Sequence, residues 1–245
     1  MLKAILLDLD GTLLGNSMEV FVPAYLEALG GFLSNYVPPR RLVTELLNAT
    51  RVMAANDGTG PTNEEVFASA FYPALGRERS QLEPVIRRFY AEEFPKLRPL
   101  TRPVPEAPRL VEWAFDRGLQ VAVATNPLFP RTAIEQRLQW AGVGVQQFPY
   151  ALVTTYEAMH ACKPHPAYYT EILSLLGRKP GECLMAGDDW GADVLPSTGL
   201  GCRAWWVAHP AAKPPATLPR LVGQGHLSAL LAHLLASESG PGDRS

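Results

Sequence analysis

Two acidic residues near the amino terminus, Asp8 and Asp10, have the type and spacing of a cation-dependent catalytic pair. The apolar run 4–7 before them predicts a short buried strand, which Gly11 brings to an end. Because side chains alternate along an extended chain, both carboxylates should point to the same side, where they repel each other unless a cation or a proton lies between them. The hydroxyl of Thr12 is expected to tie down the turn. The alternative is an ordinary turn with two solvated aspartates.

A second acidic cluster follows the apolar run 183–186 and contains Asp188, Asp189 and Asp193. Adjacent aspartates at a strand end are costly without a cation, and carboxylate oxygens are ligands that suit Mg²⁺. The cluster therefore favours a magnesium site. The alternative is a helix amino terminus enriched in aspartate, which accounts for at least one of the three residues.

Two further polar groups are placed where an α/β fold would collect them. Thr125 and Asn126 follow the apolar run 119–124, and a hydroxyl with backbone N–H groups at that point can hold phosphoryl oxygens. Lys163 precedes a proline-rich helix start and can direct its ammonium at the same pocket. The alternatives are an ordinary helix cap and a solvated lysine. We expect His165 to be a cap or a surface residue.

The elements that must position these groups alternate between strand and helix in the second half of the chain. We expect strands over residues 119–124, 150–154, 183–186 and 202–207, and helices over residues 106–117, 130–140, 166–176, 190–198 and 226–235. This alternation predicts an α/β fold in which a Rossmann-like parallel sheet is joined by crossover helices.

The segment between the first strand and this alternating part is expected to be entirely helical. Helices are predicted to start near residue 17, at Pro39, near Thr62 and near Ser80, and residues 99–105 form a stiff linker. The expected domains are a core of residues 1–14 and 103–236 and a helical cap of residues 15–102, followed by a disordered tail of residues 237–245. Because this insert directly follows the acidic pair, we expect it to lie above the carboxyl ends of the strands, where it could act as a lid over the site.

The composition excludes several classes of function. The 245 residues are 47% hydrophobic with a net charge of −2, so we expect neither nucleic acid nor an acidic membrane as partner. The sequence has no apolar segment near the roughly 20 residues that a membrane helix needs. Three unpatterned cysteines suit a reducing cytoplasm and argue against disulfides or a zinc site. A monomer and a homodimer both remain open.

Taken together, the four polar clusters resemble the motifs of the haloacid dehalogenase-like hydrolases, in the order of that family. They are DLDGT at Asp8, the pair at Thr125, KPHP at Lys163, and the acidic cluster from Gly187 to Asp193. The helical insert resembles the subgroup with a helical cap. The resemblance implies a Rossmann-like sheet, a hairpin flap and a mobile cap. His165 and Ala192 stand where many relatives have Asp and Asn, which puts substrate and fine geometry in doubt, but not the reaction class.

The resemblance also implies a role for each motif. Asp8 would be the nucleophile that forms an aspartyl-phosphate, and Asp10 would be the general acid and then the base that activates water. Mg²⁺ would be held by Asp8, Asp188 and the backbone carbonyl of Asp10. Lys163, with Thr125 and Asn126, would hold the phosphoryl oxygens. The supporting residues would be Thr12, Asp189 and Asp193.

This reading makes the protein a Mg²⁺-dependent phosphatase, a phosphoric monoester hydrolase acting on a small phosphorylated metabolite. Dehalogenation needs no acid and no metal, so Asp10 and the acidic cluster argue against it. A phosphomutase of the same fold and a non-catalytic phosphate-ligand binding protein remain alternatives. The cap offers arginines that could meet an anionic substrate, although most are expected in solvated faces or ion pairs: Arg40, Arg41, Arg51, Arg87 and Arg88.

Overall fold

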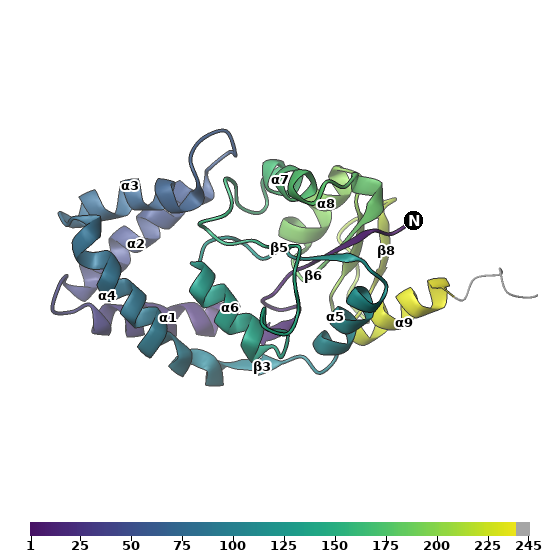
Figure 1. Cartoon of the computed structure of the whole chain (residues 1–245), viewed down its shortest axis with the longest axis horizontal. Coiled ribbons are helices and arrows are strands. Elements are labelled where there is room, and N and C mark those ends of the chain that lie inside the picture. The colour runs from purple at the N-terminus through teal and green to yellow at the C-terminus, as the bar shows by residue number, and fades with distance from the viewer. Residues whose placement is uncertain (239–245) are drawn as a thin grey trace, which may run out of the picture.

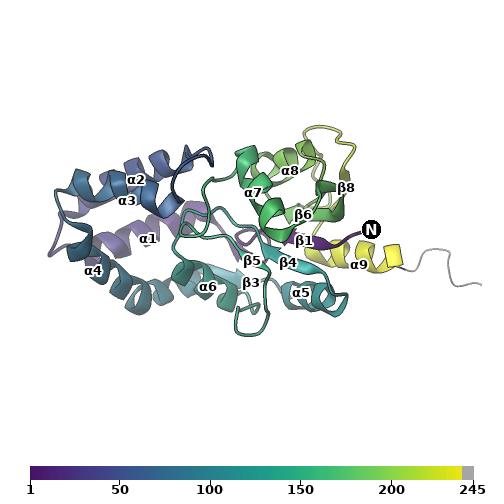
Figure 2. The same cartoon turned by 45° about the horizontal axis from the view of Figure 1, so that its top comes forward.

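The first predicted strand lies inside a parallel sheet in the computed structural model, which describes residues 1–238. β1 (Ala4–Leu7) pairs with β4 (Gln120–Val123) on one side and with β6 (Cys183–Gly187) on the other. All residues of β1 are fully buried, as expected for an uninterrupted apolar strand that is covered on both faces. The sheet order is β5-β4-β1-β6-β7-β8, with the outer strands β5 (Leu152–Val153), β7 (Arg203–Trp206) and β8 (Leu221–Gln224). Figures 1 and 2 together label most of these strands.

Helices cover both faces of this sheet, which confirms the predicted α/β architecture. Ile5 and Leu7 belong to the hydrophobic cluster that includes α5 (Ala107–Asp116) and α9 (Leu227–Glu238). Ala4 and Leu6 point into a second cluster with α7 (Pro166–Leu176). The alternation along β1 thus divides its side chains between the two layers. The remaining elements of this part are α6 (Arg131–Trp140), α8 (Leu195–Gly199), a short 3₁₀ helix at Pro180–Glu182 and a π-helical turn at Trp190–Val194.

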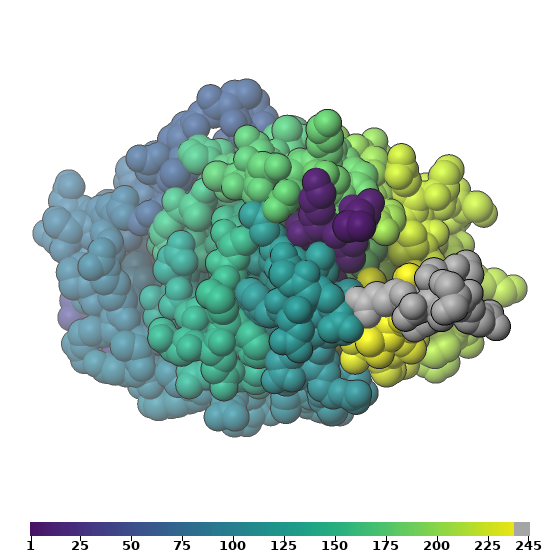
Figure 3. Space-filling model, turned by 45° about the vertical axis from the view of Figure 1, so that its right-hand side comes forward, coloured from purple at the N-terminus to yellow at the C-terminus, as the bar shows by residue number. Residues whose placement is uncertain are grey.

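The helical cap lies beyond the carboxyl ends of the central strands, on the left in Figures 1 and 2. Its third helix has a capping box, because Thr62 accepts from the backbone of Glu65 and the Glu65 side chain accepts in return from Thr62. The chain begins at the opposite end of the molecule (Figure 3), where Met1 and Leu2 line a further pocket together with side chains of α5 and α9. The cap helices are α1 (Met18–Phe32), α2 (Pro39–Ala54), α3 (Asn63–Leu75), α4 (Arg79–Glu92) and a 3₁₀ helix, η1 (Phe94–Leu100).

A two-stranded antiparallel sheet joins the cap to the core, and neither of its strands was predicted from the residues themselves. β2 (Leu14–Asn16) pairs with β3 (Thr101–Pro103), so that Asn16 lies opposite Thr101. The interpretation of residues 99–105 as a linker was therefore wrong for β3. Strands of this length carry almost no local signal, and this pair forms between segments that the whole cap separates in sequence. The expected flap takes the form of this pair, with the cap inserted between its strands.

The carboxyl-terminal part also differs from the prediction. Strand β8 was not predicted, because the segment before it is rich in proline and its residues are only half buried. Helix α9 continues to Glu238, so the first two residues of the predicted tail are helical, and residues 239–245 lie outside the described residues. None of the helices over residues 1–238 has the length and apolar character that a bilayer span requires.

An aromatic cluster fastens the cap to the core, and Phe94 lies in its middle. Phe94 is fully buried, and its ring centroid lies 5.9 Å from that of Phe21 in α1. On the core side it stacks on Trp140 of α6 at 5.5 Å and lies 6.4 Å from Phe129. Because these rings come from both sides of the junction, the cluster resists separation of the cap base from α6.

Replacing Phe94 with alanine should lower the free energy of unfolding by about 3 to 5 kcal/mol, since it removes a fully buried ring from a packed cluster. Urea unfolding would measure this loss. The matched control is Phe32→Ala, which removes a half-buried ring within the cap and should cost clearly less. Equal losses in the two variants would contradict a fastening role for Phe94.

Candidate active site

The predicted polar groups meet in one pocket at the carboxyl ends of β1, β4 and β6. Asp8 and Asp10 come directly after β1, and Gly11 has a positive φ of 82° that turns the chain away. A Cβ at Gly11 would lie 2.2 Å from Oδ2 of Asp188, so glycine is required for this close approach. The pocket has a volume of about 230 Å³, and the predicted residues that line it are Asp8, Asp10, Thr125, Asn126, Lys163, Asp188, Asp189 and Asp193.

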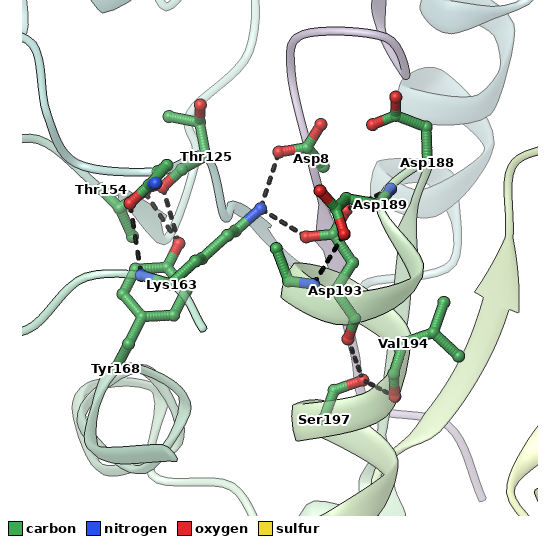
Figure 4. Close-up of polar contacts among 12 residues, drawn as sticks. Asp8, Thr125, Thr154, Lys163, Tyr168, Asp188, Asp189, Asp193, Val194 and Ser197 are labelled. Atoms are coloured by element: carbon green, nitrogen blue, oxygen red, sulfur yellow. Dashed lines mark hydrogen bonds and ion pairs between the residues drawn. The ribbon is translucent and has the colours of Figure 1, made fainter. Parts of the chain in front are cut away.

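Lys163 forms the electrostatic centre of this pocket (Figure 4). Its Nζ donates to Oδ1 of Asp8 at 2.7 Å and to Oδ1 of Asp193 at 2.5 Å. Burial lowers the pKa of Lys163, but the carboxylates of Asp193 and Asp8 outweigh it and raise the pKa well above its ordinary value. The lysine therefore remains an ammonium across the physiological pH range and balances part of the acidic charge.

The carboxylates of the pocket together carry more negative charge than the ammonium of Lys163 can balance. One oxygen from each of Asp8, Asp188 and Asp193 lies within 4.8 Å of the others. Burial and the charges of Asp193 and Asp188 raise the pKa of Asp8, although Lys163 opposes this. Burial and the charge of Asp193 raise the pKa of Asp188 to about 6, although solvent still reaches this side chain. A donor set of carboxylate oxygens with unrelieved repulsion fits a hard divalent cation such as Mg²⁺.

Thr125 and Asn126 lie on the opposite side of Lys163 and are held by local hydrogen bonds. The backbone carbonyl of Thr125 accepts from Oγ1 of Thr154 at 2.7 Å and from the hydroxyl of Tyr168 at 2.8 Å. Oδ1 of Asn126 accepts from the backbone N–H of Lys163 at 3.2 Å. These bonds link the loop after β4 to the loop before α7, so the two groups keep a fixed position relative to Lys163.

Both carboxylate oxygens of Asp10 are occupied by side chains from outside the predicted motifs. Nδ2 of Asn16 donates to Oδ1 at 3.0 Å, and a guanidinium nitrogen (Nη1) of Arg137 donates to Oδ2 at 2.5 Å. Arg137 is fully buried, and its Cζ lies 4.6 Å from the ring centre of Phe129. Within the described residues, Nε and the other terminal nitrogen of Arg137 have no hydrogen-bond partner. The orientation of Asp10 thus depends on α6 and on β2, at the base of the cap.

A protein-family model described as haloacid dehalogenase-like hydrolase matches residues 2–196. The chain belongs to this family. It is 26% identical over 207 residues to the pyrophosphatase PpaX of Bacillus pumilus, covering 84% of this chain and 83% of the relative. It is 27% identical over 205 residues to a phosphoglycolate phosphatase of Aquifex aeolicus, covering 82% and 83%. Its fold matches the crystal structure of a phosphatase of the same family from Thermococcus onnurineus with a TM-score of 0.58 and 22% identity, covering 95% and 98% of the two chains.

Membership of the haloacid dehalogenase-like hydrolases confirms the resemblance seen in the sequence and makes the protein an enzyme. Two details of the predicted site need correction or refinement. Thr12 is buried, but its hydroxyl has no partner among the described residues, so it does not tie down the turn. Asp189 is the cap of the π-helical turn, because its Oδ1 accepts from the backbone N–H groups of Gly191 and Ala192 at 2.7 and 2.8 Å.

Two other residues near the pocket have structural roles, and for His165 this is one that the sequence predicted. His165 caps α7, since its Nδ1 accepts from the backbone N–H of Ala167 at 3.1 Å. Trp190 packs edge-on against Trp206 with ring centroids 5.3 Å apart, so it fills the edge of the core.

Sequence reasoning missed Arg137, although a signal was present. Arg137 lies between Ile134 and Leu138, which are fully buried, so a charged residue interrupts the apolar face of α6. A buried cation requires a nearby anion. What the sequence could not indicate is that Asp10, 127 positions away, is that anion.

Replacing Asp188 with asparagine should stabilise the metal-free protein at pH 7.5 by about 1 kcal/mol, a value reduced for the solvent that reaches the side chain. The folded-state pKa is raised from 3.8 to about 6, so ionisation of Asp188 opposes folding above that range. Urea unfolding should therefore show the gain at pH 7.5 and lose it as the pH falls through 6 toward 3, where the carboxyl is mostly protonated in both states.

The same variant should lose most of the rise in melting temperature that Mg²⁺ gives the unmodified protein, because a ligand is removed. The matched control is Asp189→Ala, which removes the adjacent residue that caps the turn at Trp190–Val194 and should lower the free energy of unfolding by about 1 kcal/mol. A metal-free Asp188→Asn variant that is less stable than the unmodified protein would contradict this account of the repulsion.

Proposed function

We propose that this enzyme is a Mg²⁺-dependent phosphatase that hydrolyses phosphate monoesters of small molecules through an aspartyl-phosphate intermediate. The observation that carries the proposal is the buried carboxylate of Asp8, which Lys163 binds on one side and which faces Asp188 on the other. The two relatives named above, a pyrophosphatase and a phosphoglycolate phosphatase, both transfer phosphoryl groups to water, which supports hydrolysis.

The residues around Asp8 suit the binding of a phosphoryl group. Asp8, Asp188 and the backbone carbonyl of Asp10 would hold Mg²⁺, which supplies the positive charge that lets a carboxylate approach a phosphate dianion. The ammonium of Lys163 and the groups of Thr125 and Asn126 would hold the phosphoryl oxygens. In the proposed scheme, Asp193 keeps Lys163 in place from the opposite side, as its 2.5 Å hydrogen bond indicates.

The proposed chemistry has two steps. A carboxylate oxygen of Asp8 forms a bond to phosphorus while the bond to the ester oxygen breaks, and Asp10 gives its proton to the leaving alcohol. Asp10 then takes a proton from water, which attacks phosphorus and releases inorganic phosphate and free Asp8. The contact with Arg137 holds one oxygen of Asp10 in place, so the other oxygen is the one that would exchange the proton in both steps.

We also propose the domain boundaries that the sequence indicated, with a core of residues 1–14 and 103–236 and a cap of residues 15–102. Their support is that strands β2 and β3 lie at the two crossings between these parts. The three buried cysteines are free thiols, which supports a reducing compartment such as the cytoplasm.

The Asp10→Asn variant should release about one equivalent of nitrophenolate from p-nitrophenyl phosphate in a burst and then turn over at least about 100-fold more slowly than the unmodified enzyme. This activated leaving group needs no proton, so the first step survives while the second loses its base. Rapid-mixing absorbance measurements with Mg²⁺ would detect the burst.

The matched control is Asp8→Asn, which should show neither burst nor turnover, because no nucleophile is left. Turnover by Asp8→Asn would contradict the assignment of the nucleophile. If the unmodified enzyme turned over only after addition of a sugar bisphosphate, the result would favour a phosphomutase. If it gave no turnover with any divalent metal, a binding protein would be favoured.

Replacing Arg137 with methionine should lower kcat at least about tenfold and leave KM almost unchanged, because Asp10 loses the partner that fixes one of its oxygens. Steady-state kinetics would separate the two constants. Arg137→Lys keeps the positive charge and should recover part of kcat. A rise in KM without a fall in kcat would contradict a positioning role.

A further inference from the structure

A second cavity of about 250 Å³ lies between the cap helices and the loop after β4, and its walls are mostly apolar. Side chains from the cap helices α1 to α4 contribute, including Leu26 of α1, Leu46 of α2, Phe67 of α3 and Ile86 of α4. In Figure 1 these helices border the same region on the left of the molecule. A cavity of this kind loses van der Waals contacts on every wall, so it is costly unless something fills it.

The cap cavity adjoins the catalytic pocket. Met18, Leu128 and Phe129 line both spaces. Met18 begins α1 directly after β2, and the other two follow Asn126 in the loop after β4. A ligand with its phosphoryl group beside Lys163 and Asp8 can therefore extend past these three apolar side chains into the cap.

The walls of the cap cavity offer no free positive charge. Among the described residues that line it, only Glu64 and Arg79 are charged, and they pair with each other. Nε of Arg79 also donates to Oε2 of Glu83 at 2.7 Å, so two carboxylates neutralise this arginine. The hydroxyls of Tyr25 and Tyr90, which also line the cavity, bond to each other at 2.9 Å.

The cap arginines that could have met a second anionic group lie elsewhere. Arg87 pairs with Glu83, and Arg88 pairs with Glu92. Arg41 donates to the carbonyl of Ala74, and Arg51 donates to Asn48. Neither these four nor Arg40 lines the cap cavity or the catalytic pocket. A substrate with a carboxylate or a second phosphate on its leaving group would thus find no unpaired cation among the described residues that line the cap cavity.

We infer that the substrate is a phosphate monoester whose leaving group is an apolar alcohol or phenol, and that this group occupies the cap cavity. This inference rests on the proposed function, because it identifies the part of the substrate beyond the phosphoryl group. Apolar cavities of about 150 Å³ bind benzene, so the cap cavity has room for an aromatic ring with further carbons or for a medium alkyl chain. Sugar phosphates and diphosphates do not fit the chemistry of these walls.

The first test measures phosphate release with Mg²⁺ from methyl, butyl, hexyl and octyl phosphate, with phosphoglycolate and pyrophosphate for comparison. Each methylene that enters the cavity should raise kcat/KM about threefold to fourfold until the cavity is full. Pyrophosphate and phosphoglycolate should be poorer substrates than hexyl phosphate. A flat series, or a preference for either of the anionic compounds, would overturn the inference and leave the phosphatase proposal intact.

The second test measures binding and does not depend on turnover. Calorimetry with methyl, butyl and hexyl phosphonate in the presence of Mg²⁺ should give dissociation constants that fall about threefold per methylene. If no ester is hydrolysed but the phosphonates show this trend, the proposed function fails and the assignment of the cavity stands. If neither turnover nor binding depends on chain length, the inference is overturned.

A pair of variants on α3 locates the effect in the cavity. Ala68 lines the cavity, and Ala68→Phe should abolish the gain from butyl to octyl phosphate by filling it. Ser69 is exposed one position further along the helix, and Ser69→Phe should keep the full gain. Thermal unfolding would establish that both variants fold. If Ala68→Phe does not fold, the phosphonate series on the unmodified protein decides whether the inference holds. Equal chain-length dependence in two folded variants would overturn the inference.

Discussion

The ion pair between Lys163 and the carboxylates of Asp8 and Asp193 is the interaction on which the rest of the site depends. All three side chains are almost fully buried, so none of these charges could remain without the others. Nζ of Lys163 donates short hydrogen bonds to both carboxylates. With Asp188 included, three carboxylates face this one ammonium, so the site carries more negative than positive charge. The site therefore combines a fixed cation with an excess of negative charge, and this combination suits both a divalent metal ion and the oxygens of a phosphoryl group.

The sheet makes this arrangement possible because it brings distant segments to one edge. β1 lies between β4 and β6, so the polar residues that follow the three strands become neighbours in space, although Asp8 and Asp188 are 180 positions apart in the sequence. Small residues then allow the close contacts. A Cβ at Gly11 would meet Asp188, and one at Gly187 would lie 2.2 Å from Oδ2 of Asp193. The backbone geometry thus holds the carboxylates close together, and the buried strands that precede them fix their positions.

Much of the site could be predicted from the sequence, because three of the four motifs follow an apolar strand, parallel strands share an edge, and Lys163 precedes the start of a crossover helix at that edge. The sequence thus indicated Asp8, Lys163 and Asp188 as neighbours. It did not indicate the partners of Asp10, since Asn16 and Arg137 reach it only through the pairing of β2 with β3 and the packing of α6. Strand β8 was missed for a related reason. Its half-buried residues give no alternating pattern, so only its pairing with β7 reveals it.

Cap and core differ in the physical property that each presents to a ligand. The catalytic pocket is dominated by charges, which act on any phosphoryl group and do not distinguish one ester from another. The cap cavity is dominated by Leu, Ile and aromatic side chains, which distinguish ligands by volume and by the cost of burying a polar group. Phe129 belongs to both: its ring lines the two spaces, contacts the guanidinium that holds Asp10, and lies in the aromatic cluster around Phe94. A leaving group that packs against Phe129 would therefore contact the same side chain that supports Arg137, so occupancy of the cap and the orientation of Asp10 are linked through one ring.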